Sequence, residues 1–204
     1  MKKIFIFFCK FTVFPFLRFF LKEVKGKDNI PFKNNFILVS NHIDGVDHWF
    51  LLLLLQERME KLHFIGAMDS VKIFFQSALL YYLSDTIVIN RKNIKRKDLV
   101  ERVMGYLKKG EIIIIYPEGG TNKEATLLKG KTGMAEIAIK SGLPIVPVGI
   151  LREENSRKRI IKIGEPLFFK KSSQSNMRYE LLLREVTDRL MRAISKLCGK
   201  PYLY

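Results

Sequence analysis

Residues 36–47 read FILVSNHIDGVD and join an apolar run to a polar loop. The run 36–40 is short and continuously apolar, which predicts a buried strand, and the apolar residues after Asp47 predict a helix over 47–59. His42 and Asp47 therefore lie between a strand and a helix, where folds commonly hold catalytic side chains. The same spacing also fits solvated loop residues or a helix cap at Asp47, so this spacing alone does not establish a catalytic pair.

Short apolar runs alternate with amphipathic stretches along the rest of the chain. Buried strands are predicted at 62–66, 86–89, 111–116 and 145–150, an edge strand at 159–164, and helices at 70–83, 97–109, 132–141 and 175–197. Continuous apolar strands that alternate with helices predict the α/β class, with a mostly parallel or mixed central sheet covered by helices. A chain of 204 residues with 48% hydrophobic content suits a single domain. Ligand sites in such sheets gather at the carboxyl ends of strands, where His42 is placed.

Three further blocks follow the His-x4-Asp block in order. They are TIVINR at 86–91, YPEGGT at 116–121 and LPIVPV at 143–148, and the lead-in VKGKDNIP occupies 24–31. Together these blocks resemble the 1-acyl-sn-glycerol-3-phosphate acyltransferases, the PlsC-like glycerolipid acyltransferase family that makes phosphatidic acid from lysophosphatidic acid. The likeness runs from about Val24 to Gly164, and four blocks in family order are far more specific than any one alone.

The resemblance implies a reaction and two catalytic residues. An alcohol is a poor nucleophile until a base removes its proton, and His is the natural base near neutral pH. His42 would take the proton from the hydroxyl of a lysophospholipid, and Asp47 would orient the imidazole. Asp44 is the competing carboxylate, and His48 is interpreted as a helix-face residue near the site. The acyl donor would be acyl-CoA or an acyl carrier protein, attack would be direct, and no bound cofactor is expected.

The resemblance also implies an acceptor site. Arg91, just past a predicted strand, and Lys131, just before a predicted helix, would bind the phosphate of the acceptor, with Lys129 as a second candidate for the lysine. Glu118, Gly119 and Gly120 would form part of the same site, with the carboxylate ordering it and the glycines allowing close approach. Surface loop cations and a turn glutamate paired with a lysine are the structural alternatives.

Two departures from the family pattern concern the acceptor. The usual form continues Gly-Thr-Arg-Ser, whereas this chain has Gly119-Gly120-Thr121-Asn122, so the arginine is missing. One phosphate contact is therefore lost, or supplied by Lys123 or Lys131, or unnecessary because the acceptor is another lysolipid. Family members also often place a lysine near Met68. Both changes weaken the inference to lysophosphatidic acid more than the inference to acyl transfer.

The chain is strongly basic, with a formal net charge of +16 and a pI near 9.9. Basic proteins bind polyanions, and the sequence has no zinc-finger spacing, RNP-type strand or helix-turn-helix signal, so no nucleic acid is expected as a partner. An anionic membrane surface is the favoured partner, and an acidic acyl carrier protein would suit the same charge. A non-catalytic polyanion-binding protein on the same fold is the alternative from another class.

Residues 4–21 are almost wholly apolar and rich in Phe, with Lys10, Pro15 and Arg18 as interruptions. A spanning helix needs about 20 continuous apolar residues, and this segment is slightly short, internally charged and expected to kink at Pro15. We therefore expect a membrane-associating helical segment over 1–30, monotopic or shallow, on the cytoplasmic face, followed by an acyltransferase domain over 31–204. Shallow spanning and a helix packed on its own domain are the alternatives.

The two cysteines, Cys9 and Cys198, lie near opposite ends of the chain. They match no metal-ligand spacing, and the three histidines form no ligand cluster with them, so no metal site is expected. Free thiols in a reducing compartment fit this pattern best.

Overall fold

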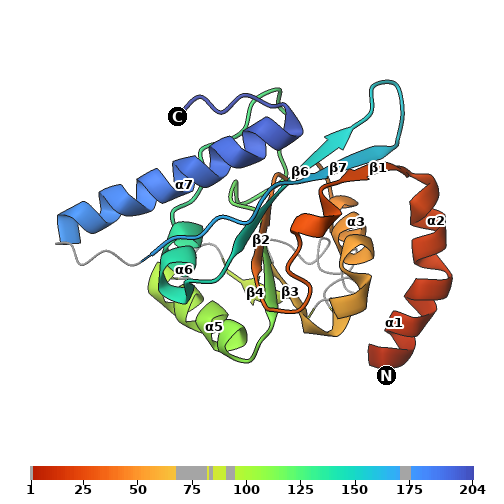
Figure 1. Ribbon diagram of the computed structural model, residues 1–204, viewed down its shortest axis with the longest axis horizontal. Helices are drawn as coiled ribbons and strands as arrows, with labels where there is room; N and C mark the ends of the chain where they lie inside the picture. Colours follow the sequence, from red (N-terminus) through yellow and green to blue (C-terminus); the bar gives the residue numbers. More distant parts are fainter. Residues whose placement is uncertain (1, 68–81, 83–84, 91–94, 171–175) are drawn as a thin grey trace.

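A single mixed sheet organises the computed structural model of the chain, which describes all residues except 1, 68–81, 83–84, 91–94 and 171–175 (Figure 1). Its seven strands are β1 (Leu21–Lys25), β2 (Ile37–Ser40), β3 (Leu62–Ala67), β4 (Ile87–Ile89), β5 (Ile112–Ile115), β6 (Ile145–Arg152) and β7 (Arg159–Ile163). Their order across the sheet is β1-β7-β6-β2-β5-β3-β4. Among these described strands, neighbours pair parallel except β6 and β7, which are antiparallel.

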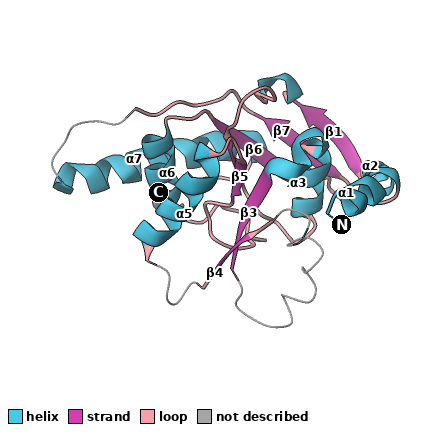
Figure 2. Ribbon diagram, turned by 90° about the horizontal axis from the view of Figure 1, so that it is seen from below, coloured by secondary structure: helices cyan, strands magenta, loops and turns pink. Residues whose placement is uncertain are grey.

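Helices cover both faces of this sheet (Figures 1 and 2). One face carries α1 (Lys2–Phe11), α2 (Val13–Phe19), α3 (Asp47–Leu54) and the 3-10 helix η2 (Gln56–Lys61), and a short 3-10 turn, η1 (Lys27–Asn29), follows β1. The other face carries α5 (Arg96–Lys108), α6 (Gly133–Ser141) and α7 (Asn176–Cys198).

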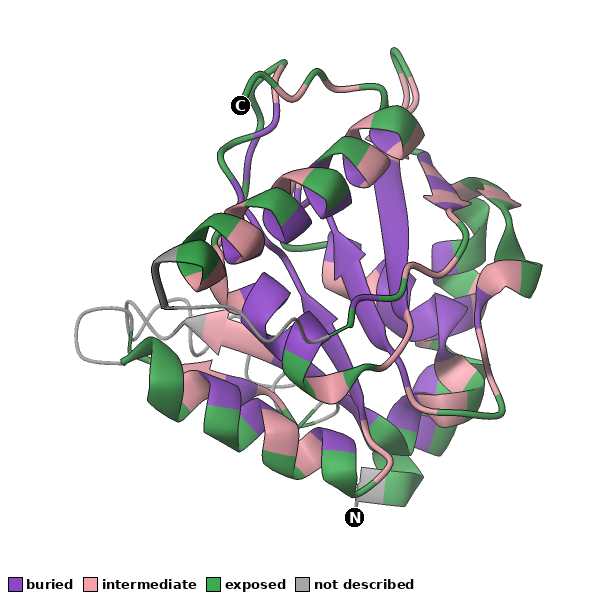
Figure 3. Cartoon of the chain, turned by 60° about the vertical axis from the view of Figure 1, so that its left-hand side comes forward, coloured by how far each residue is buried: buried purple, intermediate pink, exposed green. Residues whose placement is uncertain are grey.

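The central strands are buried on both sides, as Figure 3 shows. Leu38 and Ile114 belong to the core beneath α1–α3, whereas Ile37 and Ile113 belong to the core beneath α5–α7. Successive strand residues point to opposite faces, so a strand covered on both sides has to be apolar at every position. This double burial explains the uninterrupted apolar runs in the sequence.

The predicted α/β class with a mostly parallel, mixed sheet is confirmed. The strand predicted over 159–164 is present as β7, but its predicted edge position is wrong, because β1 pairs with β7 and takes the edge position itself. Charged residues of β1 hid it from a hydrophobicity pattern, since an edge strand needs little burial. The helix predicted from Asp47 ends at Leu54 and continues as η2. The helix predicted over 70–83 lies outside the described residues, except for Tyr82.

The N-terminal apolar segment forms two helices with the break at Thr12, so the expected kink at Pro15 is misplaced. A proline ring clashes with the carbonyl four residues earlier, and that residue is Phe11, the last of α1. Pro15 then lies in the first turn of α2, where its missing N–H is not needed. Among the described helices, none combines the length and apolar character required to cross a membrane.

Candidate active site

The candidate site forms at the carboxyl ends of β2 and β5. Asn41 fixes the chain at the end of β2, because its side-chain amide donates to the Ile150 carbonyl and accepts from the Ile150 N–H, both at 2.8 Å. His42 follows directly, and α3 begins at Asp47. The predicted strand–loop–helix arrangement therefore holds the histidine and the carboxylate at the same end of the sheet.

His42 and Asp47 are in direct contact. His42 Nδ1 lies 3.0 Å from Asp47 Oδ2, the Asp47 side chain is fully buried, and that of His42 is 9% exposed. The same Oδ2 accepts the backbone N–H groups of Ile43 at 2.6 Å and Asp44 at 2.9 Å. An ionised carboxylate only accepts, so Nδ1 carries the proton and Nε2 keeps its lone pair. Nε2 has no hydrogen-bond partner in the described part of the chain.

The competing carboxylate, Asp44, faces arginines instead of the imidazole. Its Oδ2 accepts from Arg152 Nη2 at 3.0 Å and from Arg159 Nη2 at 2.6 Å. Arg159 Nε also lies 3.5 Å from Asp47 Oδ1. The geometry thus favours Asp47 over Asp44 as the partner of His42.

Aromatic rings surround His42. Its ring stacks on Tyr116 with centroids 4.1 Å apart and an interplanar angle of 16°, and His48 meets it edge-on at 4.9 Å. Burial, and to a lesser extent the nearby His42, lowers the pKa of His48 to about 4, so His48 is neutral at pH 7. Burial raises the pKa of Tyr116 well above its ordinary value, reinforced by Asp47 and Asp44. Neither neighbour carries a charge at neutral pH.

The loop after β5 is tied to the histidine through Glu118 and Asn122. Glu118 Oε2 accepts from Asn122 Nδ2 and from the Leu128 N–H at 2.9 Å, and the Asn122 N–H donates to the His42 carbonyl at 2.6 Å. Glu118 is 6% exposed, and its Oε1 has no hydrogen-bond partner among the described residues. The carboxylate therefore orders the loop and brings it against the site.

Gly119 and Lys131 meet within this loop. Gly119 has φ +80°, and a Cβ there would lie 2.6 Å from Lys131 Nζ. The Lys131 N–H donates to the Pro117 carbonyl at 2.9 Å, and its exposed ammonium pairs with no carboxylate among the described residues. Gly120 continues the same turn and is partly exposed. The positive φ favours glycine at 119, and the end of the Lys131 side chain lies close over it.

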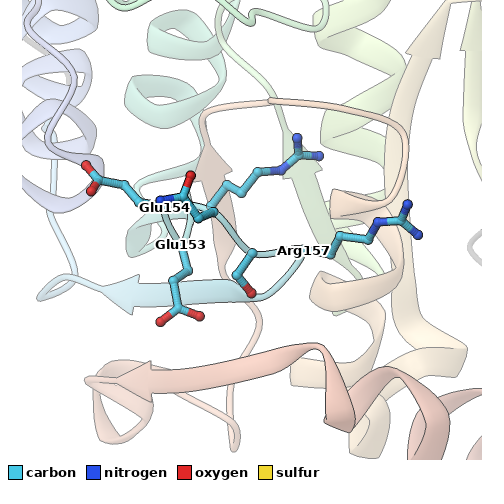
Figure 4. Close-up of a pocket in the computed structure, with 6 residues that line it drawn as sticks. Glu153, Glu154 and Arg157 are labelled. Atoms are coloured by element: carbon cyan, nitrogen blue, oxygen red, sulfur yellow. The ribbon is translucent and has the colours of Figure 1, made fainter.

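Two further features of the described residues do not extend the site, a pocket on a hairpin and the distribution of potential metal ligands. A shallow pocket on the β6–β7 hairpin is lined by Arg152, Glu153, Glu154, Asn155, Ser156 and Arg157. In Figure 4 the labelled side chains of Glu154 and Arg157 point to opposite sides of this hairpin, so it does not gather them on a ligand. No group of three potential metal-binding side chains occurs in the described ranges. Arg91 lies outside the described residues.

Sequence reasoning missed three residues that contact the site. The sequence marks Tyr116 as the end of a buried strand and the start of the YPEGGT block, and Asn122 as part of a departure from the family motif, but it assigns neither a contact with His42. Arg159 was read as the first residue of an edge strand. No sequence signal marks Arg159, because its approach to Asp47 depends on the order of strands in the sheet.

Fold and site together define an α/β protein with a buried histidine–carboxylate pair at the carboxyl ends of parallel strands, an arrangement suited to general-base catalysis. Comparison with known proteins gives the family. The Acyltransferase family matches residues 22–151, and the chain belongs to it.

Curated relatives of this chain are named 1-acyl-sn-glycerol-3-phosphate acyltransferases. It is 28% identical over 133 residues to the 1-acyl-sn-glycerol-3-phosphate acyltransferase of Borreliella burgdorferi, covering 65% of this chain and 52% of that protein. It is 28% identical over 144 residues to the chloroplastic enzyme BAT2 of Brassica napus, covering 69% of this chain and 39% of that one. The chain therefore spans about half, or less, of the length of these curated relatives.

A solved structure is also similar. The crystal structure of the 1-acyl-sn-glycerophosphate (LPA) acyltransferase PlsC from Thermotoga maritima aligns with a TM-score of 0.57 and 27% identity. The alignment covers 95% of this chain and 79% of that one. The match includes the sheet and its covering helices, in agreement with the fold class.

Proposed function

We propose that this chain is a membrane-associated O-acyltransferase that transfers a fatty acyl group from acyl-CoA or acyl carrier protein to a lysophospholipid hydroxyl. The observation that carries the proposal is the buried His42–Asp47 pair, with Nδ1 held by the carboxylate and Nε2 without a hydrogen-bond partner among the described residues. The named relatives support 1-acyl-sn-glycerol-3-phosphate as the acceptor, which would give phosphatidic acid.

The reaction needs only one proton to move and return. The acceptor oxygen attacks the thioester carbonyl while its proton passes to His42 Nε2, and Asp47 stabilises the imidazolium that forms. The C–O ester bond forms, the C–S bond breaks, and the departing thiolate takes the proton back from His42. No acyl-enzyme is required, so no serine or cysteine nucleophile is invoked.

The acceptor site is proposed around the loop after β5. Lys131 would contact the acceptor phosphate, since its ammonium has no acidic partner in the described chain and lies over Gly119. Glu118, Gly119 and Gly120 would shape this site, and Glu118 Oε1 offers a buried acceptor for a substrate hydroxyl. Arg91 remains a predicted phosphate contact.

A second acceptor class is favoured by one observation. Thr121 occupies the position of the motif arginine and is exposed, so it supplies no cation there. Acylation of a lysolipid with a different headgroup, such as an amino-acid-containing one, is therefore the second candidate function.

Membrane association is proposed from the two N-terminal helices. Each buries one side against the domain, through Ile6 and Cys9 on α1 and Phe14 and Leu17 on α2. Their other side exposes a row of large apolar side chains: Ile4, Phe5, Phe7, Phe8, Phe11, Phe16 and Phe19. Exposed apolar helix faces with nearby cations suit insertion into the acyl boundary of an anionic bilayer.

The acceptor and the base can be tested together. Purified protein in vesicles would receive radiolabelled acyl-CoA or acyl carrier protein with a panel of lysolipids, and wild type would be compared with His42→Ala and His63→Gln. We expect phosphatidic acid from wild type and His63→Gln and none from His42→Ala. Product from another lysolipid alone would select the second candidate. No turnover with any donor, together with salt-sensitive DNA binding, would replace the enzyme by a polyanion-binding protein.

The membrane contact has its own test. Replacing Phe11, Phe16 and Phe19 by serine should lower binding to anionic vesicles about tenfold or more, because each buried Phe contributes about 1.5–3 kcal/mol. Phe168→Ser is the matched control, since Phe168 is 63% exposed outside these helices. Equal loss in both variants would contradict a membrane role for α1 and α2.

A further inference from the structure

Arg159, the first residue of β7, carries a buried positive charge. Its side chain is 3% exposed. Nη2 donates to Asp44 Oδ2 at 2.6 Å, and Nη1 donates to the Arg157 carbonyl at 3.2 Å. Burying a guanidinium is costly unless carboxylates compensate it, so its partners explain why the fold tolerates it there.

The same guanidinium also faces the partner of His42. Arg159 Nε lies 3.5 Å from Asp47 Oδ1, at ion-pair distance and without hydrogen-bond geometry. Asp47 Oδ2 is already occupied by His42 Nδ1 and two backbone N–H groups. Asp47 is therefore held between an imidazole on one oxygen and a guanidinium on the other.

We propose that Arg159 is a positioning residue for acyl transfer: it fixes Asp47 against His42 and offsets the charge of the two carboxylates behind the base. This role rests on the proposed function of His42 as the general base. Among the described residues, Arg159 contacts neither the imidazole nor the proposed acceptor loop, so it acts through Asp47 and Asp44.

The groups around His42 show why a positive charge beside its neighbouring carboxylates matters. Asp47 and the neutral His48 face it from α3, Tyr116 faces it from β5, and Asp44 lies in the loop between. Two uncompensated carboxylates would favour the imidazolium and leave less free base near neutral pH. Arg159 contacts both carboxylates, whereas Arg152 contacts Asp44 and is 54% exposed.

The backbone of Arg159 is held as firmly as its side chain. Its N–H donates to the Phe20 carbonyl at 2.7 Å, and Leu21 of β1 is its register partner. The guanidinium is therefore presented to Asp47 from the junction where α2 passes into the edge strand.

The direct test is the titration of His42 by NMR on histidine-labelled full chain, with signals assigned through His48→Gln and His63→Gln. In Arg159→Met the NMR titration curve of His42 should move to higher pH than in wild type, because a cation near the pair is removed. Arg159→Lys should restore most of that shift. Arg152→Met is the matched control, because it removes an Asp44 contact without touching Asp47, and we expect its titration curve to move clearly less than that of Arg159→Met.

Kinetics provide the second readout. In Arg159→Met, kcat should fall about tenfold or more while the acceptor KM changes less than about threefold, and the acidic limb of the pH profile should move upward. If Arg159→Met does not fold, the kcat of Arg159→Lys becomes the test of the proposal. One ammonium group cannot contact both carboxylates, so we expect kcat to fall several-fold in this variant. An unchanged kcat in Arg159→Lys would then overturn the proposal.

Two other results would also overturn it. One is a folded Arg159→Met protein whose His42 titrates as in wild type. The other is an equal shift in Arg152→Met, which would assign the effect to general surface charge. Because the titration needs no substrate, it remains decisive even if wild type transfers no acyl group, and the absence of turnover would instead count against the proposed function.

Discussion

Two histidines in this molecule are buried beside carboxylates, at opposite ends of the same sheet. His42 follows the carboxyl end of β2, whereas His63 lies near the amino end of β3, which runs parallel to β2 through β5. Their side chains are 9% and 4% exposed, so burial alone does not distinguish them.

The difference lies in how the ring nitrogens are used. His63 contacts the Asp85 carbonyl through Nδ1 at 3.0 Å and Glu111 Oε2 through Nε2 at 3.4 Å, so it links three segments of the sheet with both nitrogens. Within the described part of the chain, His42 makes a hydrogen bond through Nδ1 alone. The Asp47 carboxylate is also fully buried, whereas those of Glu111 and Asp85 are 24% and 65% exposed. A buried histidine–acid contact therefore indicates a base only where one nitrogen is left for a substrate.

The largest expected effect is a difference in kcat between variants of the two carboxylates beside these histidines, Asp47 and Glu111. Asp47→Asn should lower kcat on the order of 10³-fold, because an amide can donate to Nδ1 and so stabilise the wrong tautomer of His42. Glu111→Gln should change kcat less than about threefold, since Glu111 contacts His63, which links segments of the sheet. Steady-state acyl transfer in vesicles measures kcat for both variants. Comparable losses in the two variants would contradict the different roles given to His42 and His63.

A smaller effect is expected from two lysines, Lys131 in the loop after β5 and Lys109 beside Tyr106. Lys131→Met should raise the KM for a phosphate-bearing acceptor about tenfold with little change in kcat, because a ground-state contact to phosphate is lost. Lys109 lies over Tyr106, the ring beside His63, and Lys109→Met serves as the control with no expected change in KM. An acceptor KM that is insensitive to Lys131→Met would remove this lysine from the phosphate site.

The smallest effect concerns stability and the third histidine. His48 has a folded pKa of about 4 against an ordinary value of 6.5, so below 6.5 the unfolded chain binds a proton that the folded chain does not. Its contribution to stability is present above that pH and falls as pH drops toward 4, by about 2 kcal/mol between pH 7.5 and pH 5.

Urea unfolding of His48→Phe and His63→Gln at both pH values tests this contribution. His48→Phe should lose that part of the acid sensitivity, because it has no proton to gain, and His63→Gln should keep it. Wild-type sensitivity in His48→Phe would show that His48 is not the group responsible.

Local patterns sufficed for much of the fold and part of the site. The strand before His42 and the helix from Asp47 are encoded within residues 36–54, so their geometry follows from neighbouring residues. The turn at Gly119 is similarly local. Arg159 could not be foreseen, because its contact with Asp47 requires β7 to lie between β1 and β6, and strand order is a property of the whole chain. The same holds for the contact between Asn122 and the His42 carbonyl.

Two errors have equally specific causes. The edge position of β1 was missed because its charged residues carry no burial signal and only its pairing with β7 makes it a strand. The N-terminal helix break was placed at Pro15, although the ring of that proline acts on the carbonyl of Phe11.

The measurement that tests the central claim most directly is single-turnover transfer of labelled acyl groups from acyl-CoA to lysophosphatidic acid by His42→Ala and His63→Gln, in matched vesicles and with equal amounts of folded protein. Loss of about 10³-fold or more in His42→Ala, with His63→Gln within about threefold of wild type, is the predicted result. Undiminished transfer by His42→Ala, or an equal loss in both variants, would contradict the assignment of His42 as the base.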